Sequence, residues 1–172
     1  TDPVTGEVTA TTNICPHDAA FMSVPGVELS IEQQRLEMEA RKLLEALSVA
    51  ERLKDATRHC FTRNGRHESV AEHSWMMTLM AFFLRDEFPE ADMDKVIRMC
   101  IIHDLGEAFT GDIPVFDKTE GNERTEEELL YAWVNTLPQE KAAEMMGLYE
   151  EMAARQTLEA KLYKAIDSLE AV

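Results

Sequence analysis

The sequence predicts an all-α protein, in which about six helices form a compact bundle behind an irregular N-terminal arm. The first observation is that apolar residues recur at helical spacing from residue 30 onward, while no alternating run of strand length appears. The second is a repeated capping signal, a Ser or Thr followed three residues later by Glu or Gln, which marks helix starts. The signal occurs at Ser30 with Gln33, Ser69 with Glu72 and Thr125 with Glu128.

The expected helical segments are separated by turns and by two longer irregular stretches. They cover, in order, residues 30–47, 49–57, 69–88, 92–102, 125–137, 138–155 and 158–171. Asp92, Pro138 and Thr157 are expected at the starts of three of them. Residues 58–68 are polar and basic and contain Gly65, so we expect a loop there. Gly106, Gly111 and Pro114 predict a second irregular stretch.

Two regions are expected, an arm over residues 1–29 and a helical domain over residues 30–172. Prolines, Thr and Gly dominate the arm, which we expect to pack loosely or to cross to a partner subunit. The last helical pattern reaches Val172 without a cap, so we expect the natural protein to continue. The helix after Ser69 is apolar on most sides and should be central. Its large apolar residues are Trp75, Met76, Leu79, Met80, Phe82, Phe83 and Leu84.

Composition excludes several classes of protein. The net charge of −16 argues against a nucleic-acid polymer as partner, because such binding relies on clustered Lys and Arg. No apolar run approaches the roughly 20 residues that span a bilayer, so we expect no membrane partner. The three cysteines (Cys15, Cys60 and Cys100) are odd in number and at unrelated spacings. They predict neither a disulfide framework nor a thiolate metal site, and a cytoplasmic location is the default.

Three helices each carry a polar residue on an apolar face. His103 and Asp104 are adjacent at the end of a helix that is otherwise apolar, where a charged Asp is costly unless a partner compensates it. His73 lies one turn into the central helix, and Asp167 lies amid apolar residues of the last helix. Imidazole and carboxylate both bind first-row divalent ions, and helical bundles commonly hold metals in this way. We therefore expect one shared metal ion.

Further polar residues fit the hydrolysis of a phosphate ester. Glu107 falls on the same side as His103 if the helix continues, and Asp112 follows one tight turn later. Hydrolysis needs an activated water, a proton for the leaving alkoxide and neutralisation of charge at phosphorus. A metal, these two carboxylates and a nearby arginine meet those needs.

The order His73, His103–Asp104, Asp167 resembles the H…HD…D signature of the HD-domain metal-dependent phosphohydrolases. Three sequence segments are similar to those of the branch that contains the 5'-deoxynucleotidases. They are ESVAEHSW (68–75), HDLGEAFTGDIP (103–114) and KAIDSLEAV (164–172). The resemblance covers roughly residues 36 to 172. It implies a metal-dependent phosphomonoesterase that converts deoxynucleoside 5'-monophosphates to deoxynucleoside and phosphate, and it implies a homodimer.

The resemblance also implies roles for individual residues. Its metal ligands match His73, His103, Asp104 and Asp167. Glu107 matches the acid that orders the attacking water, and Asp112 matches a second acid at the phosphate. The lining of the nucleotide site matches Ile113, Pro114 and Val115. Arg58 matches an arginine that orients the phosphate, and His59 stands where the family can have a tryptophan near the nucleotide. That departure puts the substrate contacts at His59 in question.

The site should hold a single divalent ion. HD proteins with two metals place extra histidines between the HD pair and the last Asp, and none of the five histidines lies between Asp104 and Asp167. Two His and two Asp suit Mn, Co, Fe, Ni, Zn or Mg, so the ligands leave its identity open.

Each residue also has a structural alternative. Asp167 could pair with Lys164 or Arg58, Glu107 could lie at the surface, and Asp112 could stabilise the turn. Arg58 could be an exposed loop charge, and Arg63, Arg66 and His67 of the same loop are the competing phosphate binders. Two other functions stay open. One is a phosphohydrolase for another small phosphomonoester or nucleotide, and the other is a non-catalytic scaffold that a metal stabilises.

Overall fold

A computed structural model describes residues 31–113 and 119–171 of the chain. The chain divides into two units, Thr1–Ser48 and Val49–Val172. The first unit contains most of helix α2 (Ile31–Ala50), which continues past the predicted break near Leu47. The 3-10 helix η1 (Glu51–Lys54) follows directly and replaces the predicted second helical piece. The expected N-terminal arm and the cap at Ser30 lie outside the described residues.

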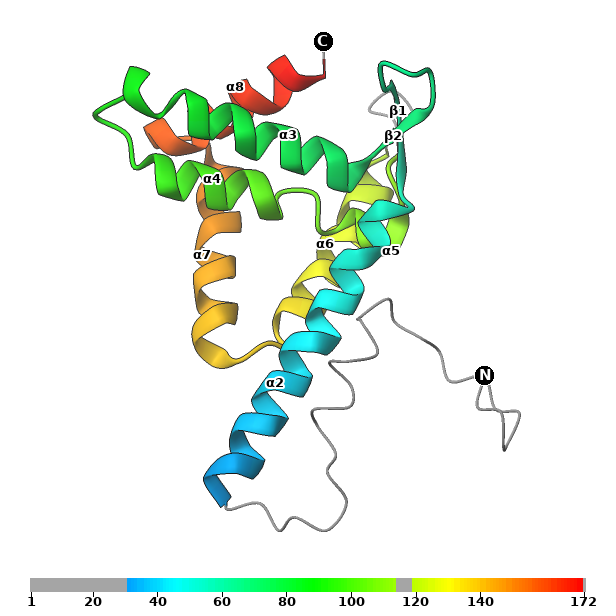
Figure 1. The fold of residues 1–172 in the computed structure, drawn as a ribbon, viewed down its shortest axis with the longest axis vertical. Helices are drawn as coiled ribbons and strands as arrows, with labels where there is room; N and C mark the ends of the chain where they lie inside the picture. Colours follow the sequence, from blue (N-terminus) through cyan, green and yellow to red (C-terminus); the bar gives the residue numbers. More distant parts are fainter. Residues whose placement is uncertain (1–30, 114–118, 172) are drawn as a thin grey trace. The chain divides into compact units, whose positions relative to one another are not determined.

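The second unit is helical apart from one short hairpin (Figure 1). Its elements are β1 (Thr57–Phe61), β2 (His67–Ser69), α3 (Val70–Phe83), η2 (Arg85–Glu87), α4 (Met93–Ile102), α5 (Glu107–Thr110), α6 (Glu120–Val134), α7 (Gln139–Ala154) and α8 (Leu158–Glu170). The all-α prediction is therefore confirmed. None of the described helices is long and apolar enough to cross a membrane.

The hairpin corrects the predicted loop over residues 58–68. Strands β1 and β2 pair antiparallel, with Thr57 opposite Ser69 and Phe61 opposite His67. Gly65 sits in the connecting turn at φ 79°, a conformation that favours glycine. The strands are so short that neither produces an alternating apolar pattern, which is why the sequence pattern did not reveal them.

Most helix starts lie where the capping residues predicted them. Ser69 and Glu72 form both hydrogen bonds of a capping box at the start of α3. Asp92 and Thr157 accept backbone hydrogen bonds at the starts of α4 and α8. The prediction at Thr125 was wrong: α6 begins at Glu120 and is capped by Thr119, whose side chain accepts from the backbone N–H of Asn122.

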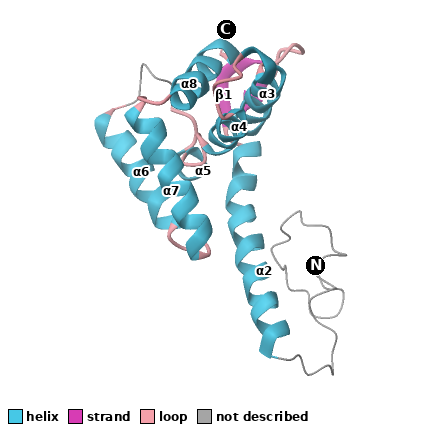
Figure 2. Ribbon diagram, turned by 90° about the vertical axis from the view of Figure 1, so that its left-hand side faces the viewer, coloured by secondary structure: helices cyan, strands magenta, loops and turns pink. Residues whose placement is uncertain are grey.

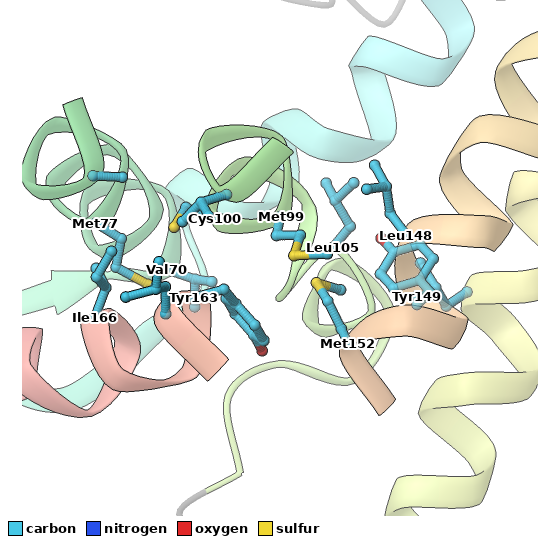
Figure 3. Packing of buried hydrophobic residues seen from close by; sticks show 14 of the residues in the cluster. Val70, Met77, Met99, Cys100, Leu105, Leu148, Tyr149, Met152, Tyr163 and Ile166 are labelled. Atoms are coloured by element: carbon cyan, nitrogen blue, oxygen red, sulfur yellow. The ribbon is translucent and has the colours of Figure 1, made fainter. Parts of the chain in front are cut away.

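The core of the second unit lies where α3, α4 and α8 pack together. Figure 3 shows Val70 and Met77 of α3 close to Ile166 of α8, with Met99 and Cys100 contributed by α4. Helix α7 extends this core through Leu148, Tyr149 and Met152. In Figure 2, α6 and α7 run alongside each other as a separate pair of helices within the unit.

Helix α3 packs centrally against α4 and α8, as expected, but only one of its apolar faces is buried. Its buried face carries Val70, His73, Met77 and Ala81. Its opposite face is apolar yet exposed, with exposed fractions of 61% for Trp75, 56% for Phe82 and 72% for Phe83. Ile101 of α4 is exposed as well.

Candidate functional site

Two histidines from neighbouring helices face each other inside the second unit. His73 lies on the buried face of α3 between Val70 and Met77 and is fully buried. His103 directly follows α4, and its side chain is 3% exposed. Their Nε2 atoms are 3.2 Å apart. Because α3 and α4 pack side by side, residues far apart in the sequence meet here.

Two carboxylates complete this group. The Asp104 Oδ2 atom lies 2.9 Å from His103 Nε2 and 3.8 Å from His73 Nε2. Asp167 arrives from α8 and places Oδ1 3.3 Å from His73 Nε2. Ligand atoms of His73, His103 and Asp167 all lie within 4.8 Å of one another, a spacing that can hold a metal ion. The structure thus brings together all four residues that the sequence singled out as ligands.

The other ring nitrogen of each histidine is held by a partner that accepts a hydrogen bond. His103 Nδ1 is 2.9 Å from the backbone carbonyl oxygen of Cys100. His73 Nδ1 contacts Oε2 of Glu170. An N–H at Nδ1 leaves the lone pair at Nε2, which is the nitrogen that faces the shared group. Both imidazoles are therefore oriented as ligands by the residues behind them.

Charges within this group shift the pKa values of its members. Burial alone would lower the pKa of His103, but the negative charge of Asp104 outweighs it and raises that pKa. Burial would raise the pKa of Asp167, but its close contacts with His73 and Lys164 lower that pKa well below its ordinary value. The pKa of Asp104 is also lowered, by His103 against the effect of burial. Both aspartates are thus ionised at neutral pH and present anionic oxygens.

Asp167 forms the salt bridge with Lys164 that was its structural alternative, and it also faces the histidines. Lys164 Nζ lies 2.5 Å from Asp167 Oδ2, whereas Oδ1 faces His73. The two oxygens thus serve different partners. The pair with Lys164 does not remove Asp167 from the group.

Glu107 is buried, with 8% of its surface exposed, so the surface alternative for this residue was wrong. It begins α5, one turn beyond the His103–Asp104 pair. Asp112 and Ile113 are half-buried directly after Gly111, whose φ of 74° marks the tight turn. The predicted lining residues Pro114 and Val115 lie outside the described residues.

Arg58 is a partly buried ion-pair residue and not an exposed loop charge. Its side chain is 10% exposed, and Nη1 lies 2.9 Å from Glu68 Oε2 and 3.1 Å from Glu170 Oε2. His59 is exposed on the alternate face of β1 and so points away from Arg58. The rival phosphate binders Arg63, Arg66 and His67 are exposed, and Arg66 pairs with Glu72.

Sequence reasoning missed Glu170, whose side chain is only 7% exposed. It follows Asp167 by three residues, so both fall on one side of α8. That spacing of two acids in an apolar helix was the available signal. Glu68, the other carboxylate on Arg58, was likewise not singled out.

The donor set suits a divalent first-row ion. Two imidazoles and two carboxylates are ligands that Mn, Fe, Co, Ni and Zn accept, and all four side chains are mostly or fully shielded from solvent. Without a cation, two ionised aspartates would lie side by side in a largely shielded group. A cation bound between them would offset that charge.

Comparison with known proteins agrees with this geometry. The model of the family described as "HD domain" matches residues 50–172. The human 5'-deoxynucleotidase HDDC2 is 31% identical over 137 residues, which are 77% of this chain and 66% of that protein. The Dictyostelium discoideum 5'-deoxynucleotidase HDDC2 is 31% identical over 139 residues, 75% of this chain and 73% of that one.

A solved structure supports the same placement. The crystal structure of a predicted metal-dependent phosphohydrolase from Magnetospirillum magnetotacticum is 30% identical, with a TM-score of 0.71. The match covers 78% of this chain and 69% of that one. This chain spans 66% of the length of the human relative, slightly under two thirds. The family match extends over the hairpin, the histidine pair and both aspartates, and the chain belongs to the HD domain family.

Proposed function

We propose that this protein is a metal-dependent phosphomonoesterase that hydrolyses deoxynucleoside 5'-monophosphates to deoxynucleoside and phosphate. The observation that carries the proposal is the convergence of the Nε2 atoms of His73 and His103 with the carboxylates of Asp104 and Asp167. The nucleotide class is supported by relatives that are named 5'-deoxynucleotidases and resemble about three quarters of this chain.

His73, His103, Asp104 and Asp167 would hold one divalent ion. When bound, such an ion supplies positive charge to the phosphate and makes a neighbouring water more acidic. The described residues contain one other cluster that could hold a metal, formed by Glu68, His73 and Glu170. The Arg58 guanidinium already supplies the positive charge there, within 3.1 Å of both glutamates. A single ion at the first group is therefore the proposal.

Glu107 and Asp112 are the proposed proton-handling residues. The water oxygen attacks phosphorus while the bond from phosphorus to the 5' oxygen breaks. Glu107, buried one turn beyond the His103–Asp104 pair, would orient this water and accept its proton. Asp112 is proposed as the second acid at the phosphate, where the departing 5' oxygen takes up a proton.

Arg58 is the proposed phosphate-orienting residue. A guanidinium offers paired N–H donors that match phosphate oxygens. Ile113, Pro114 and Val115 are proposed to line the nucleotide site, and His59 stays a proposed contact despite its exposed position. A cytoplasmic homodimer and the division into a 1–29 arm and a 30–172 domain are further parts of the proposal.

A nucleotide panel tests the proposal. Phosphate release is measured for deoxynucleoside and ribonucleoside 5'-monophosphates, deoxynucleoside 3'-monophosphates, triphosphates and sugar phosphates, each with Mn, Co, Ni, Zn and Mg. We expect release from the deoxynucleoside 5'-monophosphates above all others. Faster release from triphosphates or sugar phosphates would replace the proposed substrate, and no release with any metal would favour the scaffold alternative.

A matched variant excludes a contaminating phosphatase. Asp104→Asn keeps the shape of the side chain but removes the charge that faces His103. The activity should fall with this substitution. The substitution Asp94→Asn changes an acid that is 67% exposed, far along α4 from the site, and should leave the activity unchanged.

A further inference from the structure

One carboxylate oxygen links the metal group to the proposed phosphate-binding arginine. Glu170 Oε2 contacts Nδ1 of His73 and lies 3.1 Å from Nη1 of Arg58. The three side chains come from α8, α3 and β1, and their exposed fractions are 7%, 1% and 10%. The contact therefore joins three elements within the interior of the second unit.

This oxygen favours one tautomer of His73. A carboxylate can only accept a hydrogen bond from a neutral imidazole, so Glu170 favours the proton at Nδ1. The lone pair at Nε2 then faces Asp167 and His103. Partners of this kind behind a metal-binding histidine fix its ring and raise its basicity.

The same oxygen anchors Arg58. Burial alone lowers the pKa of Arg58, but the hydrogen bond and charge of Glu170, with Glu68, outweigh it and raise that pKa. Arg58 therefore stays charged, and Glu170 holds one end of its guanidinium. Glu68 holds the same nitrogen, Nη1, at 2.9 Å. Both of these bonds to described residues leave from Nη1, so Nε and Nη2 are the donors that we expect to meet a phosphate.

We propose that Glu170 is a positioning residue that sets both the metal ligand His73 and the phosphate-binding Arg58 through one oxygen. The inference rests on the proposed function and adds to it a coupling between the affinity for metal and the affinity for the substrate phosphate. Loss of Glu170 should weaken both, whereas loss of Glu68 should affect Arg58 alone.

The full chain, stripped of metal, is titrated with Mn²⁺ or Zn²⁺ in competition with a chelating dye. Glu170→Ala should lower metal affinity by about 10–100-fold. Glu170→Gln should recover most of it, because an amide oxygen still accepts from His73 Nδ1–H. Glu68→Gln is the matched control, since it removes the other carboxylate on Arg58 and should leave metal affinity unchanged while raising KM for the nucleotide.

The tautomer of His73 gives a readout that does not depend on activity. In the metal-free protein, ¹⁵N shifts of the ring should show the proton at Nδ1 in wild type and in Glu170→Gln. That preference should be lost in Glu170→Ala. Glu170→Asp keeps the charge but is one methylene shorter, so it should also lose the preference and decides the matter if the alanine variant fails to fold.

The outcomes separate the two proposals. A wild type that binds metal and hydrolyses nucleotide, together with a folded Glu170→Ala of unchanged metal affinity and tautomer, would overturn this inference alone. Equal losses of metal affinity in Glu170→Ala and Glu68→Gln would also overturn it, because the effect would then come from Arg58. A wild type that binds no metal would overturn the proposed function and this inference together.

Discussion

The Nε2 atoms of His73 and His103 lie 3.2 Å apart, although thirty residues separate them in the chain. Each ring is fixed from behind, His103 by the carbonyl oxygen of Cys100 and His73 by Glu170. Neither ring can donate a hydrogen bond to the other unless its proton moves from Nδ1 to Nε2. A divalent ion between them satisfies both lone pairs and the charges of Asp104 and Asp167.

Metal removal should therefore destabilise the protein. An ion that binds only the folded chain stabilises it by about 2.7 kcal/mol when its free concentration is 100 times Kd. We expect the Tm to fall when a chelator is added and to recover with excess Mn²⁺ or Zn²⁺, as followed by differential scanning calorimetry.

The double substitution His103→Ala with Asp104→Asn is the control for this effect. It removes two of the four proposed ligands, so its Tm should not respond to chelator or metal. A wild-type Tm that ignores both additions would contradict a metal at this site.

Asp112→Ala should abolish turnover while the metal stays bound. If Asp112 manages a proton at the phosphate, its loss lowers kcat by about 10²–10⁴-fold, the usual range for general acid–base catalysis. Phosphate release gives kcat, and the dye competition gives metal affinity. Full activity in the variant would remove Asp112 from the mechanism and leave it the role of stabilising the turn after Gly111.

The fold could be predicted where the signal is local. Ser69 with Glu72 and Asp92 mark their helices because the capping hydrogen bonds lie within four residues of chain. The start of α6 was misplaced because Thr125 offers the same spacing with Glu128 that Thr119 fulfils with Asn122. The hairpin was not predicted because its short strands are stabilised by pairing with each other, and no local sequence pattern indicates that pairing.

The candidate site was likewise predictable only where its signal is local. His73, His103, Asp104 and Asp167 were conspicuous because each is polar on an apolar helix. The role of Glu170 depends on β1 bringing Arg58 to α8, a contact over 112 residues that spacing cannot reveal. The exposure of Phe83 was also unpredictable, because a pattern that is apolar all round does not say which faces find partners.

Acid should weaken the contribution of Glu72 to stability. Hydrogen bonds from Arg66 and from the Ser69 backbone lower the pKa of Glu72 from 4.5 to about 2. A lowered folded-state pKa stabilises the protein above pH 4.5, and this contribution is lost as the pH falls toward 2. Glu72→Gln should thus destabilise at pH 7 and have a smaller effect at pH 3, as measured by urea denaturation.

The Arg66→Gln background is the control for the charge. Because the pair is well exposed, the effect should be small and sensitive to salt. In that background, Glu72→Gln should lose most of its pH dependence. A difference between wild type and Glu72→Gln that grows toward pH 3 would contradict the assigned pKa direction.

Met77 should be among the residues on which stability depends most. It is fully buried, one turn after His73 on the inner face of α3, and points toward α8 near Ile166 (Figure 3). Met77→Ala leaves a cavity and should lower the free energy of unfolding by about 2–5 kcal/mol. Met76→Ala is the matched control, since this neighbour has the same side chain at 38% exposure, and the change should cost far less. Urea denaturation followed by circular dichroism measures both, and equal losses would show that α3 does not bury the face that carries His73.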